Sequence, residues 1–178
     1  MEEILNSKII IVTGGSRGIG SAIVKKLAKD GNIVVLNYNK SEESAKSVEN
    51  DLKKQGFFVD IYKADVSKRE EADKLINYTI EKYGKIDILI NNAGISQTKL
   101  FTDITDDDWK TMMDVNLTSA FYCSREAAKN MIHNKSGLII NISSIWGEIG
   151  SSCEVHYSTA KAGLIGFTKA LAKELRTI

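Results

Sequence analysis

The sequence predicts an α/β domain in which a parallel β-sheet is covered by helices on both faces. Short runs of Ile, Val and Leu alternate along the chain with longer segments whose apolar residues recur at helical spacing. Runs that are apolar at nearly every position are buried on both faces, which is typical of a parallel sheet between two helical layers. A length of 178 residues is sufficient for one such doubly wound domain with a sizeable core.

The expected strands and helices follow one another without a linker, an internal repeat or a low-complexity stretch. Apolar and β-branched runs predict strands at Lys8–Val12, Ile33–Leu36, Phe57–Tyr62, Ile86–Ile90 and Gly137–Ile142. Helical periodicity predicts helices at 18–30, from Ser41 to about Gln55, at 68–83, at 106–133 and from about His156 onward. Ser41 is typical of an N-cap, and Asp30-Gly31 and Gly84 are typical of helix ends.

The charge balance and the cysteines exclude several classes of protein. The chain has 24 Lys and Arg against 23 Asp and Glu, so it lacks the basic surface typical of binding to nucleic acid or to an anionic membrane. No signal-like start and no long apolar run occur, so a cytoplasmic protein is expected. Cys123 and Cys153 have neither metal-ligand spacing nor a suitably placed His, so both are expected to be packing residues, and no metal site is expected.

The turn after the first strand is rich in glycine and reads Thr-Gly-Gly-Ser-Arg-Gly-Ile-Gly from Thr13 to Gly20. In such a turn Gly14 permits the tight bend, Gly18 lets the backbone approach a pyrophosphate, and Gly20 lets the helix pack closely on the strand. The N-terminus of the following helix offers amide donors and its positive dipole end to the phosphates. Between a first strand and a first helix the motif indicates a dinucleotide site, whereas alone it could be a simple turn.

Tyr157 and Lys161 are spaced for proton transfer. Four residues apart on a helix, they lie on one face about one turn apart. A Lys ammonium beside a phenol stabilises the phenolate, so the Tyr can exchange a proton with a carbonyl or an alcohol near neutral pH. An isolated Tyr-x-x-x-Lys is more often an exposed pair, and the other motifs favour the chemical interpretation.

Taken together, these motifs resemble those of the short-chain dehydrogenase/reductase family. The resemblance rests on the Gly-rich turn, on Asn-Asn-Ala-Gly at 91–94 after the fourth strand, and on Ser144, Tyr157 and Lys161, and it extends from about Lys8 onward. It implies a Rossmann-type doubly wound parallel sheet with helices on both faces and a single NADP-binding domain over residues 1–178. It also implies an NADP-dependent oxidoreductase that acts on ketones or alcohols.

The resemblance implies four catalytic residues. Tyr157 is the expected acid/base, and Lys161 is expected to tune it and to bind the nicotinamide ribose. Ser144 is expected to donate to the substrate carbonyl, with Ser143 as a competing candidate at a less suitable spacing. Asn116, on the long helix, is expected to hold a water of the proton relay; without the other motifs it would be a helix Asn bonded locally. The residues expected to contact the substrate are therefore Ser144 and Tyr157.

The resemblance also implies the cofactor contacts. They are Gly14, Ser16, Arg17, Gly18, Ile19, Gly20, Asn37, Asn39, Lys40, Asp65, Val66, Asn92, Ala93, Gly94, Tyr157 and Lys161. Asp65 and Val66 would contact the adenine, although Asp65 could equally be a turn residue or a helix cap. Asn-Asn-Ala-Gly at 91–94 would line the cofactor, although by itself it is merely turn-like.

The end of the second strand predicts which cofactor is preferred. An acidic residue there normally bonds the adenosine ribose and repels a 2′-phosphate. This chain has Asn37-Tyr38-Asn39-Lys40 instead, with no carboxylate before Glu42. Arg17 and Lys40 could face the same pocket, where cations favour a phosphate. NADP(H) is therefore expected in preference to NAD(H), unless Lys40 is only a solvated loop charge.

The family pattern continues beyond the Tyr-Lys helix, whereas this chain ends at Ile178. The resemblance therefore implies a fold truncated after the sixth helix, without the C-terminal strands and the substrate lid. The strand Gly137–Ile142 is apolar on both faces, which makes a poorly protected sheet edge.

Within the family the chain is most similar to bacterial 3-oxoacyl-[acyl-carrier-protein] reductases of fatty acid biosynthesis, which implies a carbonyl substrate linked to a carrier protein or another protein. The stretch 144–157 is similar instead to a branch that reduces a 5-aminopentanone group on elongation factor P. There Trp146, Glu154 and His156 could contact the substrate or could only pack the loop. A non-catalytic dinucleotide-binding protein of the same fold is the alternative from another class.

The long helix at 106–133 and the last helix are rich in small residues. In the family these two helices pair between subunits. A homodimer or homotetramer is therefore expected.

Overall fold

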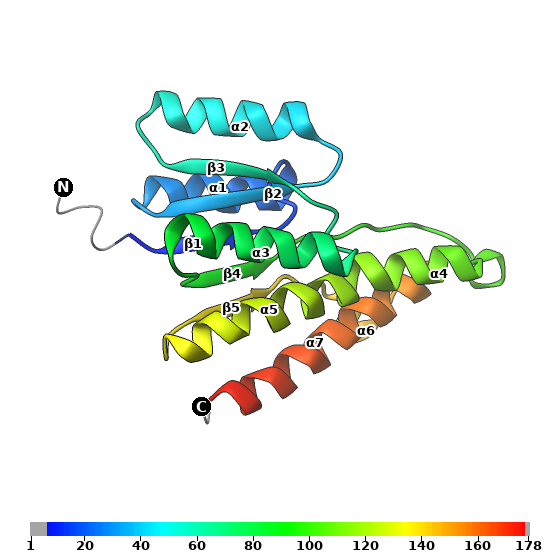
Figure 1. Ribbon diagram of the computed structural model, residues 1–178. Helices are drawn as coiled ribbons and strands as arrows, with labels where there is room; N and C mark the ends of the chain where they lie inside the picture. The colour runs from blue at the N-terminus through cyan, green and yellow to red at the C-terminus, as the bar shows by residue number, and fades with distance from the viewer. Residues whose placement is uncertain (1–6, 177–178) are drawn as a thin grey trace.

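A parallel β-sheet of five strands forms the centre of the protein, a computed structural model of which describes residues 7–176. The predicted helix end at Thr177 and Ile178 lies outside these residues. The strands are β1 (Ile9–Val12), β2 (Ile33–Tyr38), β3 (Val59–Lys63), β4 (Ile88–Asn91) and β5 (Leu138–Asn141). Their order across the sheet is β3-β2-β1-β4-β5. All five predicted strands are present, and the predicted doubly wound α/β fold is confirmed (Figure 1).

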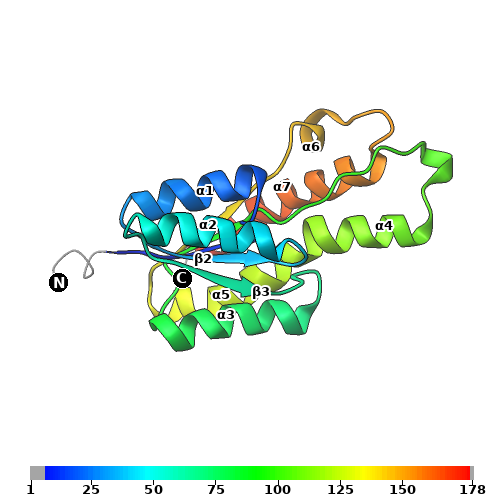
Figure 2. The same cartoon turned by 90° about the horizontal axis from the view of Figure 1, so that it is seen from above.

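Helices cover both faces of this sheet (Figures 1 and 2). They are α1 (Gly18–Lys29), α2 (Glu42–Lys54), α3 (Arg69–Tyr83), α4 (Asp106–Met113), α5 (Ser119–His133), α6 (Trp146–Ile149) and α7 (Val155–Leu175). Two short turns, the 3₁₀ turn η2 (Phe101–Asp103) and the π-helical turn η3 (Asp114–Thr118), complete the list. Helices α1 and α2 lie on one face, and α3 and α5 on the other.

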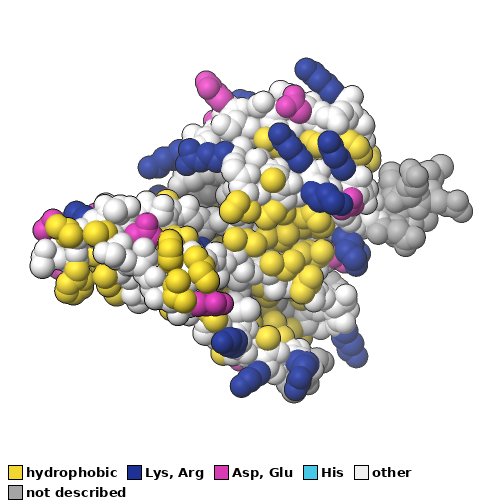
Figure 3. Space-filling model, turned by 180° about the vertical axis from the view of Figure 1, so that it is seen from behind, with side chains coloured by type: hydrophobic (Ala, Val, Ile, Leu, Met, Phe, Trp, Pro, Cys, Tyr) yellow, Lys and Arg dark blue, Asp and Glu magenta, His cyan; other side chains and the backbone are white. Residues whose placement is uncertain are grey.

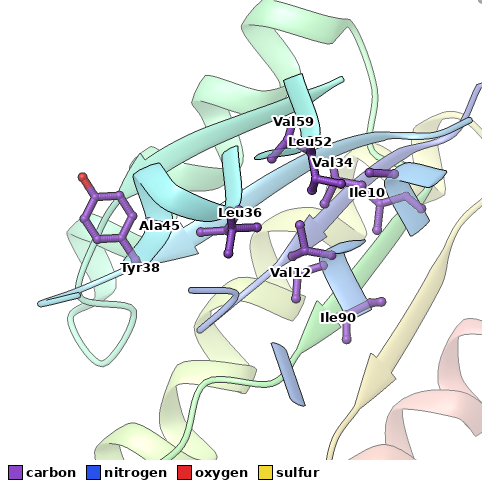
Figure 4. Packing of buried hydrophobic residues seen from close by; sticks show 12 residues of the cluster. Ile10, Val12, Val34, Leu36, Tyr38, Ala45, Leu52, Val59 and Ile90 are labelled. Atoms are coloured by element: carbon purple, nitrogen blue, oxygen red, sulfur yellow. The ribbon is translucent and has the colours of Figure 1, made fainter. Parts of the chain in front are cut away.

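Successive residues of the central strands point into two separate cores. Ile10 and Val12 pack with α1 and α2, whereas Ile11 between them packs with α3 and α5. Figure 4 shows the first of these cores, in which Val12 and Leu36 lie beside each other. Because each fully buried Ile, Leu or Val contributes roughly 1.5–3 kcal/mol, the continuous apolar strands stabilise both layers at once.

The helix boundaries follow local signals. Gly31 and Gly84 have positive φ values of 84° and 81° and end α1 and α3, as predicted. Ser41 occupies the N-cap of α2, but its side chain makes no capping hydrogen bond. The Thr105 hydroxyl accepts from the Asp108 amide, and the Asp108 carboxylate accepts from the Thr105 amide, which forms a capping box for α4.

The helix predicted over 106–133 is present with these bounds, and the π-helical turn η3 inside it separates α4 from α5. The Asn116 side-chain amide donates to the Met112 carbonyl oxygen at 3.0 Å. In an α-helix that oxygen accepts from the backbone amide of residue 116, so the side chain competes with the regular ladder. A π turn of this kind is common at functional sites.

The two edges of the sheet differ. At one edge Asp60 of β3 accepts hydrogen bonds from Tyr78, Lys82 and Tyr83 of α3 at 2.5, 2.7 and 3.1 Å. Burial and the neighbouring Asp60 charge raise the pKa of Tyr83 to about 12. This cluster fastens the edge strand to its helix.

At the opposite edge β5 pairs with β4 alone, as expected for the strand over 137–142. Leu138 and Ile140 on one face of β5 are 51% and 37% exposed. A groove of about 380 Å³ lies between β5, the end of α5 and the C-terminal half of α7. Figure 3 shows hydrophobic side chains gathered in the middle of the face opposite to that of Figure 1.

Candidate active site

The order of the sheet brings two turns together at the carboxyl ends of its central strands. Strand β1 pairs with β2 on one side and β4 on the other, so the chain reverses direction across the sheet at this point. The crevice at such a switch point is where ligands bind in open α/β sheets. The Gly-rich turn at 13–18 follows β1, and the turn at 92–94 follows β4.

Two features of the Gly-rich turn favour glycine: positive φ angles and a close approach of the backbone. Gly14 and Gly18 have positive φ values of 64° and 54°. A Cβ atom at Gly20 would lie 2.2 Å from the Gly14 carbonyl oxygen, so a side chain there would force the turn and α1 apart. Arg17, the N-cap of α1, makes no side-chain capping bond, which leaves the first amides of the helix available for an anion.

Thr13 and Asn92 join the two turns. The Thr13 hydroxyl accepts from the amides of Asn92 and Ala93, both at 3.0 Å. The Asn92 side chain donates to the carbonyl oxygens of Thr13 and Gly14 at 3.0 and 3.1 Å. These four bonds make the two turns one unit. Sequence reasoning assigned no role to Thr13, although it directly precedes the first glycine of the motif.

Asn116 lies in η3 and is fully buried. Its side-chain oxygen Oδ1 accepts a hydrogen bond from the Ile95 amide at 3.2 Å. A Cβ atom at Gly94 would lie 2.8 Å from this oxygen and 3.6 Å from the Lys161 ammonium nitrogen. The turn after β4, the π turn and α7 therefore meet at Gly94, where only a glycine fits.

Lys161 is 4% exposed although it carries an ammonium group. Nζ donates to the Ile142 carbonyl oxygen at 2.8 Å and lies 5.8 Å from the centre of the Tyr157 ring. Burial away from water lowers the pKa of Lys161. The spacing predicted from sequence thus places the Tyr157 ring and the Lys161 ammonium on the same side of α7.

The two candidate serines differ in their hydrogen bonds. The Ser143 hydroxyl donates to the Lys161 backbone carbonyl at 3.0 Å, which attaches the loop after β5 to α7. The Ser144 oxygen accepts from the Trp146 amide at 3.2 Å. Because this bond uses an oxygen lone pair, the Ser144 O–H can still donate to a substrate. The geometry favours Ser144 over Ser143.

The residues at the end of β2 separate into two groups. Asn37 is 1% exposed; its oxygen accepts from the Gly14 amide at 3.3 Å, and its Nδ2 donates to the Ala64 carbonyl at 3.0 Å. Asn39 and Lys40 are exposed. The structure thus gives Asn37 a supporting role beneath the Gly-rich turn, and its predicted contact with a cofactor stays a prediction.

The remaining predicted cofactor residues lie around these turns. Asp65 accepts from the amide and the hydroxyl of Ser67 at 3.1 and 2.6 Å, which is the turn role considered above. Val66 packs in the core beside α3 and α5, and Ser16 is 8% exposed. Ile19, in the first turn of α1, is 66% exposed.

His156 was expected to contact the substrate or pack the loop, and it is 0% exposed. Its Nε2 lies 2.9 Å from the Gln97 side-chain oxygen. The ring, in the first turn of α7, is therefore buried against the segment that carries Gln97. Nothing in the sequence links positions 97 and 156, so this pair could not be predicted.

No group of three or more His, Cys, Asp or Glu side chains within residues 7–176 could hold a metal ion. Burial raises the pKa of the Cys123 thiol to about 12, as expected for a packing residue. No described helix has both the length and the apolar character that crossing a membrane requires.

Comparison with protein families gives a match over nearly the whole chain. A family model described as short chain dehydrogenase matches residues 8–178. A 3-oxoacyl-[acyl-carrier-protein] reductase of Synechocystis is 43% identical over 171 residues, which cover 96% of this chain and 69% of that protein. A reductase of the same name from Chlamydia pneumoniae is 41% identical over 175 residues, which cover 98% of this chain and 70% of that protein.

A solved structure of the same family is also similar to this chain. A metagenomic short-chain oxidoreductase in complex with NADP superposes with a TM-score of 0.92 at 32% sequence identity. The match covers 96% of this chain and 77% of that protein.

Proposed function

Because the chain belongs to the short-chain dehydrogenase/reductase family, we propose that it is an NADPH-dependent ketoreductase that acts on 3-oxoacyl groups carried by an acyl-carrier protein. The names of its relatives at 41–43% identity support this substrate class. The NADP complex of the related oxidoreductase supports the cofactor.

One observation carries the proposal: Asn116 and the Lys161 ammonium meet at Gly94, and the Tyr157 ring lies 5.8 Å from that ammonium. The Lys161 ammonium, buried and held by the Ile142 carbonyl, lies one helical turn from the phenol. Structural packing alone gives no reason to bury a cation without a carboxylate partner. A positive charge beside a phenol is what a proton-transfer site requires.

The residues around the two turns fit a dinucleotide. The positive φ angles of Gly14 and Gly18 and the lack of space at Gly20 make a cradle that backbone alone can line. The first amides of α1 are free of a side-chain cap and would bind the pyrophosphate. The exposed Ile19 would pack against the cofactor, and Ala93 and Gly94 would line its nicotinamide end.

In the proposed mechanism the protein polarises a carbonyl and supplies a proton. NADPH, when bound, supplies the hydride. Ser144 and Tyr157 donate hydrogen bonds to the carbonyl oxygen and stabilise the negative charge that develops there. Tyr157 then transfers its proton to that oxygen, and the Lys161 charge stabilises the phenolate that remains. Asn116 would hold the water that returns a proton to this site.

The proposal is tested by following NADPH oxidation with an acetoacetyl thioester as substrate. Steady turnover is expected, and the same assay without thioester is the control. A protein that binds NADPH but turns over no ketone would instead be the non-catalytic dinucleotide-binding alternative.

The predicted preference for NADPH is tested at Arg17. Neither Arg17 nor Lys40 takes part in an ion pair within residues 7–176, while Glu42 pairs with Lys46 at 2.6 Å. A cation free to meet the 2′-phosphate makes a charge-assisted bond worth about 1.5–3 kcal/mol. Arg17→Ala is therefore expected to raise the KM for NADPH roughly 10- to 100-fold, with the KM for NADH nearly unchanged. Lys29→Ala, at the far end of α1, is the control, and an unchanged KM for NADPH in Arg17→Ala would refute the contact.

Reduction of the 5-aminopentanone group on elongation factor P remains the alternative substrate prediction. Glu154, directly before α7, would suit a cationic aminoketone better than an acyl thioester. Turnover of the modified factor, measured beside the acetoacetyl thioester, separates the two reductases.

Single-domain organisation and assembly as a homodimer or homotetramer also remain proposals. Phe121 of α5 is 40% exposed and meets Phe167 of α7 edge to face at 6.5 Å. An aromatic pair across these two helices, with Phe121 exposed and Phe167 half-buried, supports them as the contact between subunits.

A further inference from the structure

We propose that His156 is a positioning residue of the reaction: through Gln97 and Asp108 it fixes the segment between β4 and α4 against the start of α7, and so holds Tyr157 at the carbonyl. The proposal rests on the proposed function, since it concerns the acid/base Tyr157. It adds residues that the family resemblance did not assign.

A continuous chain of hydrogen bonds links α7 to α4. His156 Nε2 lies 2.9 Å from Gln97 Oε1, and Gln97 Nε2 donates to Asp108 Oδ1 at 3.1 Å. The other carboxylate oxygen, Asp108 Oδ2, accepts from Lys99 Nζ at 2.5 Å and from the Thr105 amide and hydroxyl at 3.0 and 2.7 Å. These bonds, Lys99 foremost, hold the pKa of Asp108 well below its usual range.

The charge of Asp108 sets the direction of every bond in this chain. A carboxylate only accepts, so Gln97 must turn its NH₂ group toward Asp108 and its oxygen toward His156. His156 must then carry its hydrogen on Nε2 and donate it. In the neutral ring this selects one tautomer, with the lone pair on Nδ1. Nδ1 is buried and has no hydrogen-bond partner among the described residues, so the hydrogen bond to Gln97 is the one that orients the ring.

The segment held in this way forms one side of the candidate site. At its beginning the Ile95 amide donates to Asn116, beside Gly94 and Lys161. Two residues farther on, Gln97 bonds His156, the neighbour of Tyr157. A shift of this segment therefore moves both ends of the site together.

A second tie acts on the loop that precedes α7. The Lys99 amide donates to the Cys153 carbonyl oxygen at 2.7 Å. Cys153 has a φ of 60°, in the left-handed region that non-glycine residues rarely adopt. Such a conformation persists only where surrounding contacts enforce it. Two hydrogen bonds enforce this conformation, one at His156 and one at Cys153, and both come from the segment between β4 and α4.

The test compares kinetic constants in full-length variants. His156→Leu keeps most of the buried volume but removes the donor, and Gln97→Leu breaks the same bond from a half-buried loop position. Each is expected to lower kcat for an acetoacetyl thioester at least tenfold while the Kd for NADPH changes less than twofold. The double variant should lose no more than Gln97→Leu alone, because that substitution already removes the bond to His156. His156→Gln, which can still donate to Gln97, should restore most of kcat.

Two controls separate positioning from stability and from the proposed function. His133→Leu makes the same substitution at an exposed position on α5 and should leave kcat unchanged. Imidazole ¹⁵N spectra of the wild type should show a protonated Nε2 and a bare Nδ1. An active wild type with unaltered kcat in His156→Leu and Gln97→Leu would overturn the positioning role alone. A wild type that reduces no ketone would overturn the proposed function, and the role of His156 with it.

Discussion

Tyr157→Phe will bind NADPH as the wild type does and will lose roughly 10²–10⁴-fold in kcat for the carbonyl substrate. The change removes one oxygen and keeps the ring whose centre lies 5.8 Å from the Lys161 ammonium. The packing of α7 should therefore survive, while the group that polarises the carbonyl and protonates its oxygen is gone. Single-turnover kinetics and a calorimetric titration with NADPH measure the two effects separately.

Tyr62→Phe is the matched control for this variant. Tyr62 lies in β3, where its ring stacks on Tyr78 at 4.6 Å, and its hydroxyl makes no hydrogen bond within residues 7–176. Its kcat should equal that of the wild type. Residual activity near wild type in Tyr157→Phe would mean that another group is the acid, and the mechanism would have to be abandoned.

The second large effect is expected at Gly20, where a single methyl group should disrupt the cofactor cradle. In Gly20→Ala the added Cβ would lie 2.2 Å from the Gly14 carbonyl oxygen and 2.6 Å from the Asn92 side-chain nitrogen. Overpacking of this kind costs about 1–3 kcal/mol, and here part of the cost falls on the turn that would bind the pyrophosphate. The Kd for NADPH is expected to rise at least tenfold, and the free energy of unfolding in urea is expected to fall.

Gly166→Ala provides a control of opposite sign. Gly166 is an exposed position of α7, and a Cβ atom there would meet nothing within 4 Å. Replacing glycine by alanine in an exposed helix stabilises by about 0.5–1 kcal/mol. This variant should be slightly more stable than the wild type and bind NADPH equally well. Equal NADPH affinity in Gly20→Ala would show that the turn does not hold the cofactor.

The sequence was sufficient to predict the elements because local physics determines them. Continuous apolar runs such as Ile33–Leu36 can be buried only between two helical layers, and glycines with positive φ end the helices where expected. Tyr157 and Lys161 could be paired for the same reason, since helical spacing alone places them on one face.

What the sequence could not predict depends on contacts between distant residues. The π turn arises where the Asn116 side chain displaces a backbone amide, which no periodicity reveals. The burial of Asn37 follows from its bonds to Gly14 and Ala64, which lie on two other segments. His156 meets Gln97 across 59 positions of the chain. Residue type and spacing do not predict contacts between such distant residues. The family resemblance assigns roles only to residues that match the motifs of the family.

The hydrogen bonds of Thr13 and Asn92, which join the two turns, have a consequence for folding during synthesis. These bonds span 79 positions, and strand β1 in the middle of the sheet finds its second neighbour only when β4 has been made. Closing such long loops is slow, because their entropy is lost before any contact compensates it. A nascent chain that has left the ribosome only as far as β2 therefore contains the whole glycine motif but lacks the second turn of the candidate site. A dinucleotide held by both turns would therefore stabilise only chains in which Ala93 has already reached Thr13.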